Sequence, residues 1–145
     1  IPMNPELLSL AENNNPKAVD LMMDWAHGPA GHFGGHPVPG LYHLNTGSML
    51  AQTRTIKDTL GVDFRACDNY KNGFEAAKKI KIPTLSILAT GDKMCPVKEG
   101  QKLASTIEGS VVEIIDNCGH MMLLEEADQV LKVLKKFILK NYPAK

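Results

Sequence analysis

The sequence predicts an α/β fold in which two parallel strands with flanking helices follow a segment built of helices alone. β-Branched and aliphatic runs occur only in the carboxyl-terminal half, from Ile82 to Thr90 and from Val111 to Ile115. A helical stretch separates these runs, and strand–helix–strand units form parallel, right-handed crossovers. Before the first run, only helical patterns and turn residues occur.

The amino-terminal segment, residues 1–78, predicts helices over residues 5–12, 16–26, 46–60 and 63–70. Asn15 is a good cap for the second helix, and Pro16 fits its first position because the missing amide costs nothing there. Gly61 predicts the end of the third helix. The glycine- and proline-rich stretch from Gly28 to Gly40 predicts a long loop, and loops of this length are more often functional.

The second segment, residues 79–145, contains both strands. A helix is expected from Val97 to Ile107, and a last helix is expected to pack on the sheet through one apolar face, made of Val130, Leu131, Leu134, Phe137 and Ile138. Parallel sheets are covered on both faces and rarely consist of two strands. We therefore expect the remaining strands to come from outside this chain.

Composition excludes several classes of function. Lys plus Arg and Asp plus Glu both number 16, so the zero net charge favours neither nucleic acid nor an anionic membrane as a partner. No run is apolar enough to predict a membrane span or a signal peptide. The 3 cysteines include no Cys-x-x-Cys pair, which predicts a reducing, cytoplasmic location without disulfides or a zinc site. The non-methionine start at Ile1 suggests an internal cut point.

Asp92 and His120 are the candidate catalytic residues, because each directly follows the end of a predicted strand. This edge of an open α/β sheet is where ligands bind. A carboxylate that orients an imidazole, which in turn takes a proton from a hydroxyl, is the chemistry of an activated nucleophile. Taken singly, Asp92 could be a turn residue that caps the next helix, and His120 a surface histidine. Together they predict a hydrogen bond of about 2.6 to 3.2 Å.

The stretches Gly91-Asp92-Lys93-Met94-Cys95-Pro96 and Gly119-His120, with Glu125 five residues later, resemble the closing third of an α/β-hydrolase. That family places its acid in Gly-Asp-x-x-x-Pro and its histidine in Gly-His-x-x-x-x-Glu. The resemblance implies a partial α/β-hydrolase sheet over residues 79–145, preceded by a helical cap over residues 1–78. It also implies that Asp92 is the orienting acid and His120 the general base.

The nucleophile of this family lies on a Gly-x-Ser-x-Gly elbow that precedes both residues in the chain. None of the serines stands in that pattern; they are Ser9, Ser48, Ser86, Ser105 and Ser110. We therefore interpret the chain as a carboxyl-terminal fragment that lacks the nucleophile and is inactive alone. The expected partners are a missing amino-terminal half or a second copy of the chain.

The predicted function is that of a serine hydrolase fragment acting on a small ester or other acyl substrate, without a metal or organic cofactor. Three alternatives stay open. Within the family, dehalogenases and epoxide hydrolases use an aspartate nucleophile, and carbon–carbon bond hydrolases keep the serine. The third alternative is a non-catalytic interaction module that pairs with another subunit.

Other polar groups receive structural interpretations. The spacing of His27, His32, His36 and His43 matches no metal motif, so we expect solvated loop histidines. The glycines of that loop do not form a nucleotide-binding turn. Glu125 is interpreted as a helix-start carboxylate that interacts with the helix dipole, and Cys95 and Cys118 as small packing residues.

Overall fold

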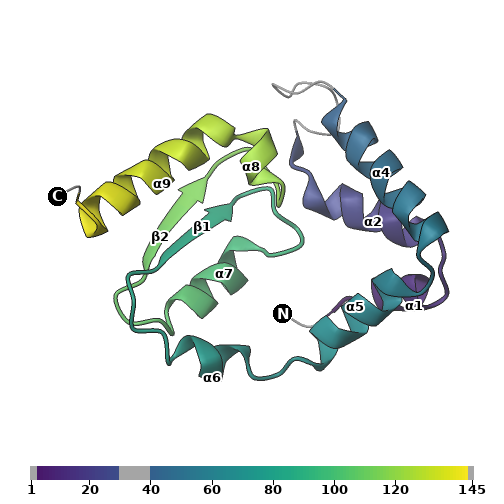
Figure 1. The fold of residues 1–145 in the computed structure, drawn as a ribbon, viewed down its shortest axis with the longest axis horizontal. Coiled ribbons are helices and arrows are strands. Elements are labelled where there is room, and N and C mark those ends of the chain that lie inside the picture. The colour runs from purple at the N-terminus through teal and green to yellow at the C-terminus, as the bar shows by residue number, and fades with distance from the viewer. Residues whose placement is uncertain (1–2, 30–39, 144–145) are drawn as a thin grey trace.

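The computed structural model describes residues 3–29 and 40–143 (Figure 1). Within these residues, helices alone precede the first strand: α1 (Pro5–Glu12), α2 (Lys17–Ala26), α4 (Leu41–Thr55), α5 (Thr59–Asn69) and α6 (Gly73–Ala77). Strands and helices then alternate: β1 (Leu85–Ala89), α7 (Val97–Ala104), β2 (Val111–Ile115), α8 (Met122–Glu125) and α9 (Ala127–Asn141). No helix of the described residues is both long and apolar enough to cross a membrane.

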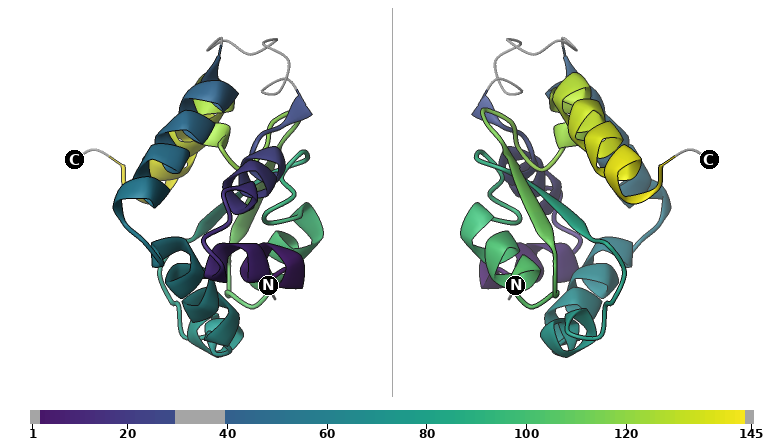
Figure 2. Two further views of the ribbon diagram at one scale, coloured as in Figure 1. Left: turned by 90° about the vertical axis from the view of Figure 1, so that its right-hand side faces the viewer. Right: turned by 90° about the vertical axis from the view of Figure 1, so that its left-hand side faces the viewer.

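The predicted parallel crossover unit is confirmed. β1 and β2 pair in parallel, with Leu85 opposite Val111 and Ala89 opposite Ile115. α7 connects the two strands, and α7 and α9 lie on opposite sides of them (Figure 2). Both strands therefore end at the same edge of the sheet.

The buried apolar side chains form two clusters. The larger one joins α1, α2 and α5 through Leu7, Leu8, Ala11, Ala18, Val19, Met22, Met23 and Phe64. The smaller one lies where the strands end, and consists of Ala89, Ile115, Cys118 and Val130. The helices α1 to α5 and the strand region thus each have their own core.

The prediction that Gly61 ends a helix is wrong. Gly61 lies inside α5 and packs on α1, where an added Cβ would be 2.9 Å from Glu12 Cα. The break between α4 and α5 comes earlier, at Asp58, which has a left-handed φ of 65° and is fixed by hydrogen bonds to Asn14. The sequence pattern cannot distinguish a glycine that ends a helix from one that permits close helix packing.

The prediction that one face of the last helix packs on the sheet holds only in part. Val130 is buried in the smaller core, but Leu131 is 63% exposed and Ile138 is 51% exposed. Val112 and Ile114 of β2 are exposed as well. These four side chains are called the uncovered apolar residues below. The described residues contain no third strand or further helix that covers them.

Candidate active site

Asp92 and His120 form the hydrogen bond that the sequence predicts. His120 Nδ1 lies 2.9 Å from Asp92 Oδ2. Asp92 follows β1 and is 7% exposed, whereas the side chain of His120, which follows β2, is 49% exposed. An ionised carboxylate only accepts hydrogen bonds, so Nδ1 carries the donated proton. The other ring nitrogen, Nε2, is then the one that can accept a proton.

The second oxygen of Asp92 makes a contact within the turn, although Asp92 does not cap α7 as the alternative interpretation proposed. Asp92 Oδ1 accepts a hydrogen bond from the backbone amide of Cys95 at 2.8 Å, just before Pro96 and α7. The two roles are compatible because each uses a different oxygen. The turn contact also fixes the orientation of the carboxylate that faces His120.

The pKa of His120 is raised above its ordinary value of 6.5. The hydrogen bond to Asp92 is the largest cause, and the negative charge of Asp92 acts in the same direction. Partial burial of the ring opposes both, because burial disfavours the charged imidazolium. Asp92 therefore makes His120 a stronger base than an isolated histidine.

The loop that carries His120 packs directly against the end of α2. The amide of Met121 donates to Ala26 O at 3.1 Å, and an added Cβ on Gly119 would lie 2.4 Å from Gly28 N. On the other side, Gly91 donates to Cys118 O at 2.9 Å. Backbone meets backbone at these points, which leaves no room for side chains.

Glu125 lies in the first turn of α8, as expected for a helix-start carboxylate, but its side chain binds amides outside that helix. It is the last residue of α8 and is 1% exposed. Its Oε2 accepts hydrogen bonds from two backbone amides, Gly28 at 2.9 Å and Gly119 at 3.0 Å. The sequence did not indicate these partners because Gly28 is 97 positions away in the chain, and no local pattern reveals such a contact.

The interpretation of His27 as a solvated loop residue is also wrong. His27 is 1% exposed at the end of α2; its Nδ1 donates to Met23 O, and the amide of Asn45 donates to its Nε2. His43 is exposed, and His32 and His36 lie outside the described residues. Within residues 3–29 and 40–143, no group of three His, Cys, Asp or Glu side chains is arranged to hold a metal ion.

The packing interpretation of Cys118 is confirmed, since this residue is fully buried in the smaller core. Burial, followed by the charge of Glu125, raises the pKa of its thiol to about 11. Cys95 is half-buried, and burial followed by the charge of Asp92 raises its pKa as well. Neither thiol is a thiolate at neutral pH, and neither is poised to act as a nucleophile.

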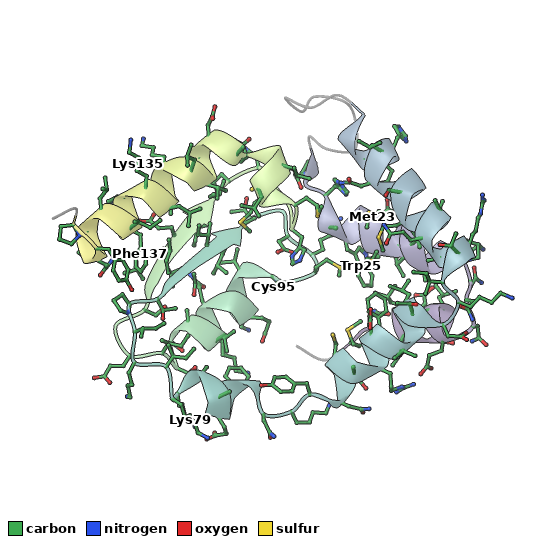
Figure 3. The ribbon with its side chains drawn as sticks, in the orientation of Figure 1. Met23, Trp25, Lys79, Cys95, Lys135 and Phe137 are labelled. Atoms are coloured by element: carbon green, nitrogen blue, oxygen red, sulfur yellow. The ribbon has the colours of Figure 1, made fainter. Side chains whose placement is uncertain are left out.

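A cavity of about 300 Å³ lies between the helices and the loop that carries Asp92. Its apolar lining includes Leu7, Trp25 and Met94, and the Lys93 amide donates to Trp25 O at 3.2 Å. In Figure 3, Trp25 on α2 and Cys95 on this loop lie toward the middle of the molecule. A larger cavity, about 470 Å³, opens between α6 and α7 and includes Cys95.

Among relatives with known names, the chain is 37% identical over 60 residues to a monoacylglycerol lipase of Bos taurus. It is 34% identical over 64 residues to a proline iminopeptidase of Lactobacillus crispatus. The matched stretches cover 41% and 44% of this chain, but only 18% and 22% of those proteins. The chain matches no known family profile.

Solved structures match almost the whole chain. A thermophilic esterase superposes with a TM-score of 0.77 at 27% identity, over 97% of this chain and 52% of the esterase. A bromoperoxidase of Bacillus anthracis superposes with a TM-score of 0.73 at 18% identity, over 92% of this chain and 47% of that protein. The chain thus spans about half the length of these enzymes. These matches and the parallel strand pair with its flanking helices show that the chain has a partial α/β-hydrolase fold.

Proposed function

We propose that the chain supplies the acid and the base of a serine hydrolase that acts on an ester or a similar acyl substrate. The observation that carries the proposal is the 2.9 Å hydrogen bond between His120 Nδ1 and the buried Asp92. The other oxygen of Asp92 is held by the backbone amide of Cys95. This arrangement leaves Nε2 on a half-exposed ring, as a general base requires. The names of two similar proteins, a lipase and an esterase, support an acyl substrate.

In the proposed reaction, a serine hydroxyl attacks the carbonyl carbon of the ester while His120 Nε2 takes the hydroxyl proton. His120 then gives this proton to the departing alcohol, which leaves the acyl group on the serine. A water molecule, deprotonated by the same nitrogen, releases the acid and restores the serine. Asp92 holds the imidazole in the correct tautomer and stabilises its charged form.

The serine is proposed to belong to another polypeptide segment. Within the described residues, His120 has no hydrogen bond besides that to Asp92, and Ser48 lies within α4 rather than after a strand. An amino-terminal half of the same protein would supply the elbow, the remaining strands and the donors that stabilise the oxyanion. The proposed acyl site is the 300 Å³ cavity, because Lys93 and Met94 in its lining directly follow Asp92.

The test is to assay the chain alone and together with the proposed amino-terminal half, using p-nitrophenyl acetate. We expect no hydrolysis by the chain alone above that of free imidazole, and hydrolysis by the two halves together. Asp92→Asn in the combined enzyme should lower kcat by about four orders of magnitude. Asp116→Asn is the matched control, because Asp116 is an exposed carboxylate that also follows a strand.

Two results would contradict the proposal. One is ester hydrolysis by the chain alone that disappears in His120→Ala, which would place a nucleophile inside this chain. The other is a combined enzyme in which Asp92→Asn has no more effect than Asp116→Asn. A Gly-x-Asp-x-Gly elbow in the amino-terminal half would redirect the assay to haloalkanes and epoxides.

The cytoplasmic location stays a prediction.

A further inference from the structure

The buried carboxylate of Glu125 has an unusual set of partners. Its Oε2 accepts from the amides of Gly28 and Gly119, and its Oε1 is buried without a hydrogen-bond partner among the described residues. No Lys or Arg of these residues forms an ion pair with it. All of its described hydrogen bonds therefore join two loops, one after α2 and one directly before His120.

Stability alone does not explain a carboxylate at this position. Burying a charge without an opposite charge is unfavourable, and a well-packed apolar side chain of similar volume generally stabilises a core at least as well. A leucine at position 125, however, could not accept hydrogen bonds from the amides of Gly28 and Gly119. Both amides lie outside the helices and strands, so no regular hydrogen-bond pattern satisfies them. The carboxylate thus contributes an attachment between loops that an apolar side chain cannot make.

The attachment acts on the backbone of the catalytic loop itself. Gly119 directly precedes His120, and the adjoining amide of Met121 donates to Ala26 O in α2. Hydrogen bonds to α2 and to Glu125 therefore bracket His120 on both sides in the chain. Movement of this loop by even 1 Å would stretch the 2.9 Å bond between His120 and Asp92 beyond hydrogen-bond range.

We infer that Glu125 is a positioning residue for the base: its carboxylate ties the histidine loop to the carboxyl end of α2 and thereby holds His120 against Asp92. The catalytic consequence of this inference rests on the proposed function. The effect of Glu125 on the position of His120 does not. Glu125 acts through His120 and does not itself touch substrate.

Three substitutions at position 125 distinguish the effect of side-chain length from the effect of side-chain charge. Glu125→Ala removes the acceptor. Glu125→Gln keeps an oxygen at the same distance along the side chain but removes the charge. Glu125→Asp keeps the charge but is one methylene shorter, so it cannot reach both amides. Glu126→Gln is the matched control, since the neighbouring carboxylate of Glu126 accepts from Gln129 of α9 and not from the loops.

The first readout is the pKa of His120, measured by NMR titration of its ring in the chain. The pKa should fall toward 6.5 in Glu125→Ala and Glu125→Asp, and stay close to the unsubstituted value in Glu125→Gln and Glu126→Gln. The second readout is ester hydrolysis by the chain combined with its amino-terminal half. There kcat should fall about 100-fold in the Ala and Asp variants, with KM changed less than about threefold.

If Glu125→Ala does not fold, the comparison of Gln with Asp decides the matter. An unchanged His120 pKa and unchanged kcat in the Asp variant would show that Glu125 is only structural and would overturn the inference. A loss in the Gln variant at least as large as the loss in the Asp variant would overturn it too, because the length of the side chain alone would then not account for the effect. If the His120 pKa responds as stated but the unsubstituted enzyme hydrolyses no ester, the proposed function fails and the positioning role stands.

Discussion

Gly119→Ala tests whether the contact between the histidine loop and α2 is as close as the structure shows. The new Cβ would lie 2.4 Å from Gly28 N, 2.6 Å from Ala26 O and 2.6 Å from His27 C. All three atoms belong to the backbone, so no side chain can rotate away. Relief requires the loop and the end of α2 to separate by about 1 Å, since ordinary carbon contacts begin near 3.5 Å.

The magnitude follows from two contributions. Overpacking a filled site costs about 1 to 3 kcal/mol. A separation of this size also breaks at least one of the two hydrogen bonds to the Glu125 carboxylate, and bonds to charged groups contribute about 1.5 to 3 kcal/mol each. We expect Gly119→Ala to lower the free energy of unfolding by about 2.5 to 6 kcal/mol.

The measurement is urea denaturation of the chain followed by circular dichroism, at two protein concentrations so that association is separated from unfolding. Gly47→Ala is the matched control: Gly47 lies within α4, where a Cβ meets no atom within 4 Å. That substitution should raise the free energy of unfolding by about 0.5 to 1 kcal/mol, because alanine is the better helix former. Equal stability of Gly119→Ala and the unsubstituted chain would refute the close contact.

Three further predictions concern the site and the surface. His120 is protonated below its raised pKa, so hydrolysis should decline as pH falls through that value. The stability that the charged His120–Asp92 pair contributes is present below pH 6.5 and is lost as pH rises through the raised pKa of His120. Asp92→Asn should shift the decline in hydrolysis to lower pH and remove the stability contribution of the pair, as measured in pH–rate and urea profiles. Profiles that this substitution leaves unchanged would disprove the coupling. Met94→Trp should narrow the 300 Å³ cavity and lower kcat/KM for p-nitrophenyl octanoate more than for the acetate; equal effects would place the acyl group elsewhere. Because of the uncovered apolar residues, the chain should self-associate in sedimentation experiments, less so as Leu131→Lys/Ile138→Lys; a single 15.8 kDa species at all concentrations would contradict this.

Sequence reasoning succeeded where the determining signal is local. β2 and α1 have the predicted bounds, and the acid–base distance follows from two strands that end at one edge of a parallel sheet. Each of these features depends on side-chain periodicity or on a turn residue within a few positions. The hydrogen bond between Asp92 and His120 could be predicted for this reason, while their catalytic roles stay proposals.

The failures share a different cause. The burial of His27 and of Glu125, and the place of Gly61 inside a helix, all depend on segments that are distant in sequence. Glutamate is almost never fully buried without partners, so the sequence suggested only a helix-start carboxylate at Glu125 and not its burial. Its two backbone partners become visible only when α2 and the histidine loop are placed side by side.

The geometry of the candidate site therefore has two independent supports. The parallel register aligns Ala89 with Ile115, and the short loops that follow these residues carry Asp92 and His120. A register shift of one residue would displace one side chain by about 3.3 Å, more than the whole 2.9 Å bond. The sheet thus determines whether the acid and the base can meet, but it does not fix the histidine loop, which extends beyond the last paired residue. The end of α2 and Glu125 hold this loop, so the helices before the first strand contribute to the position of His120 as well as to the cavity lined by Trp25 and Met94.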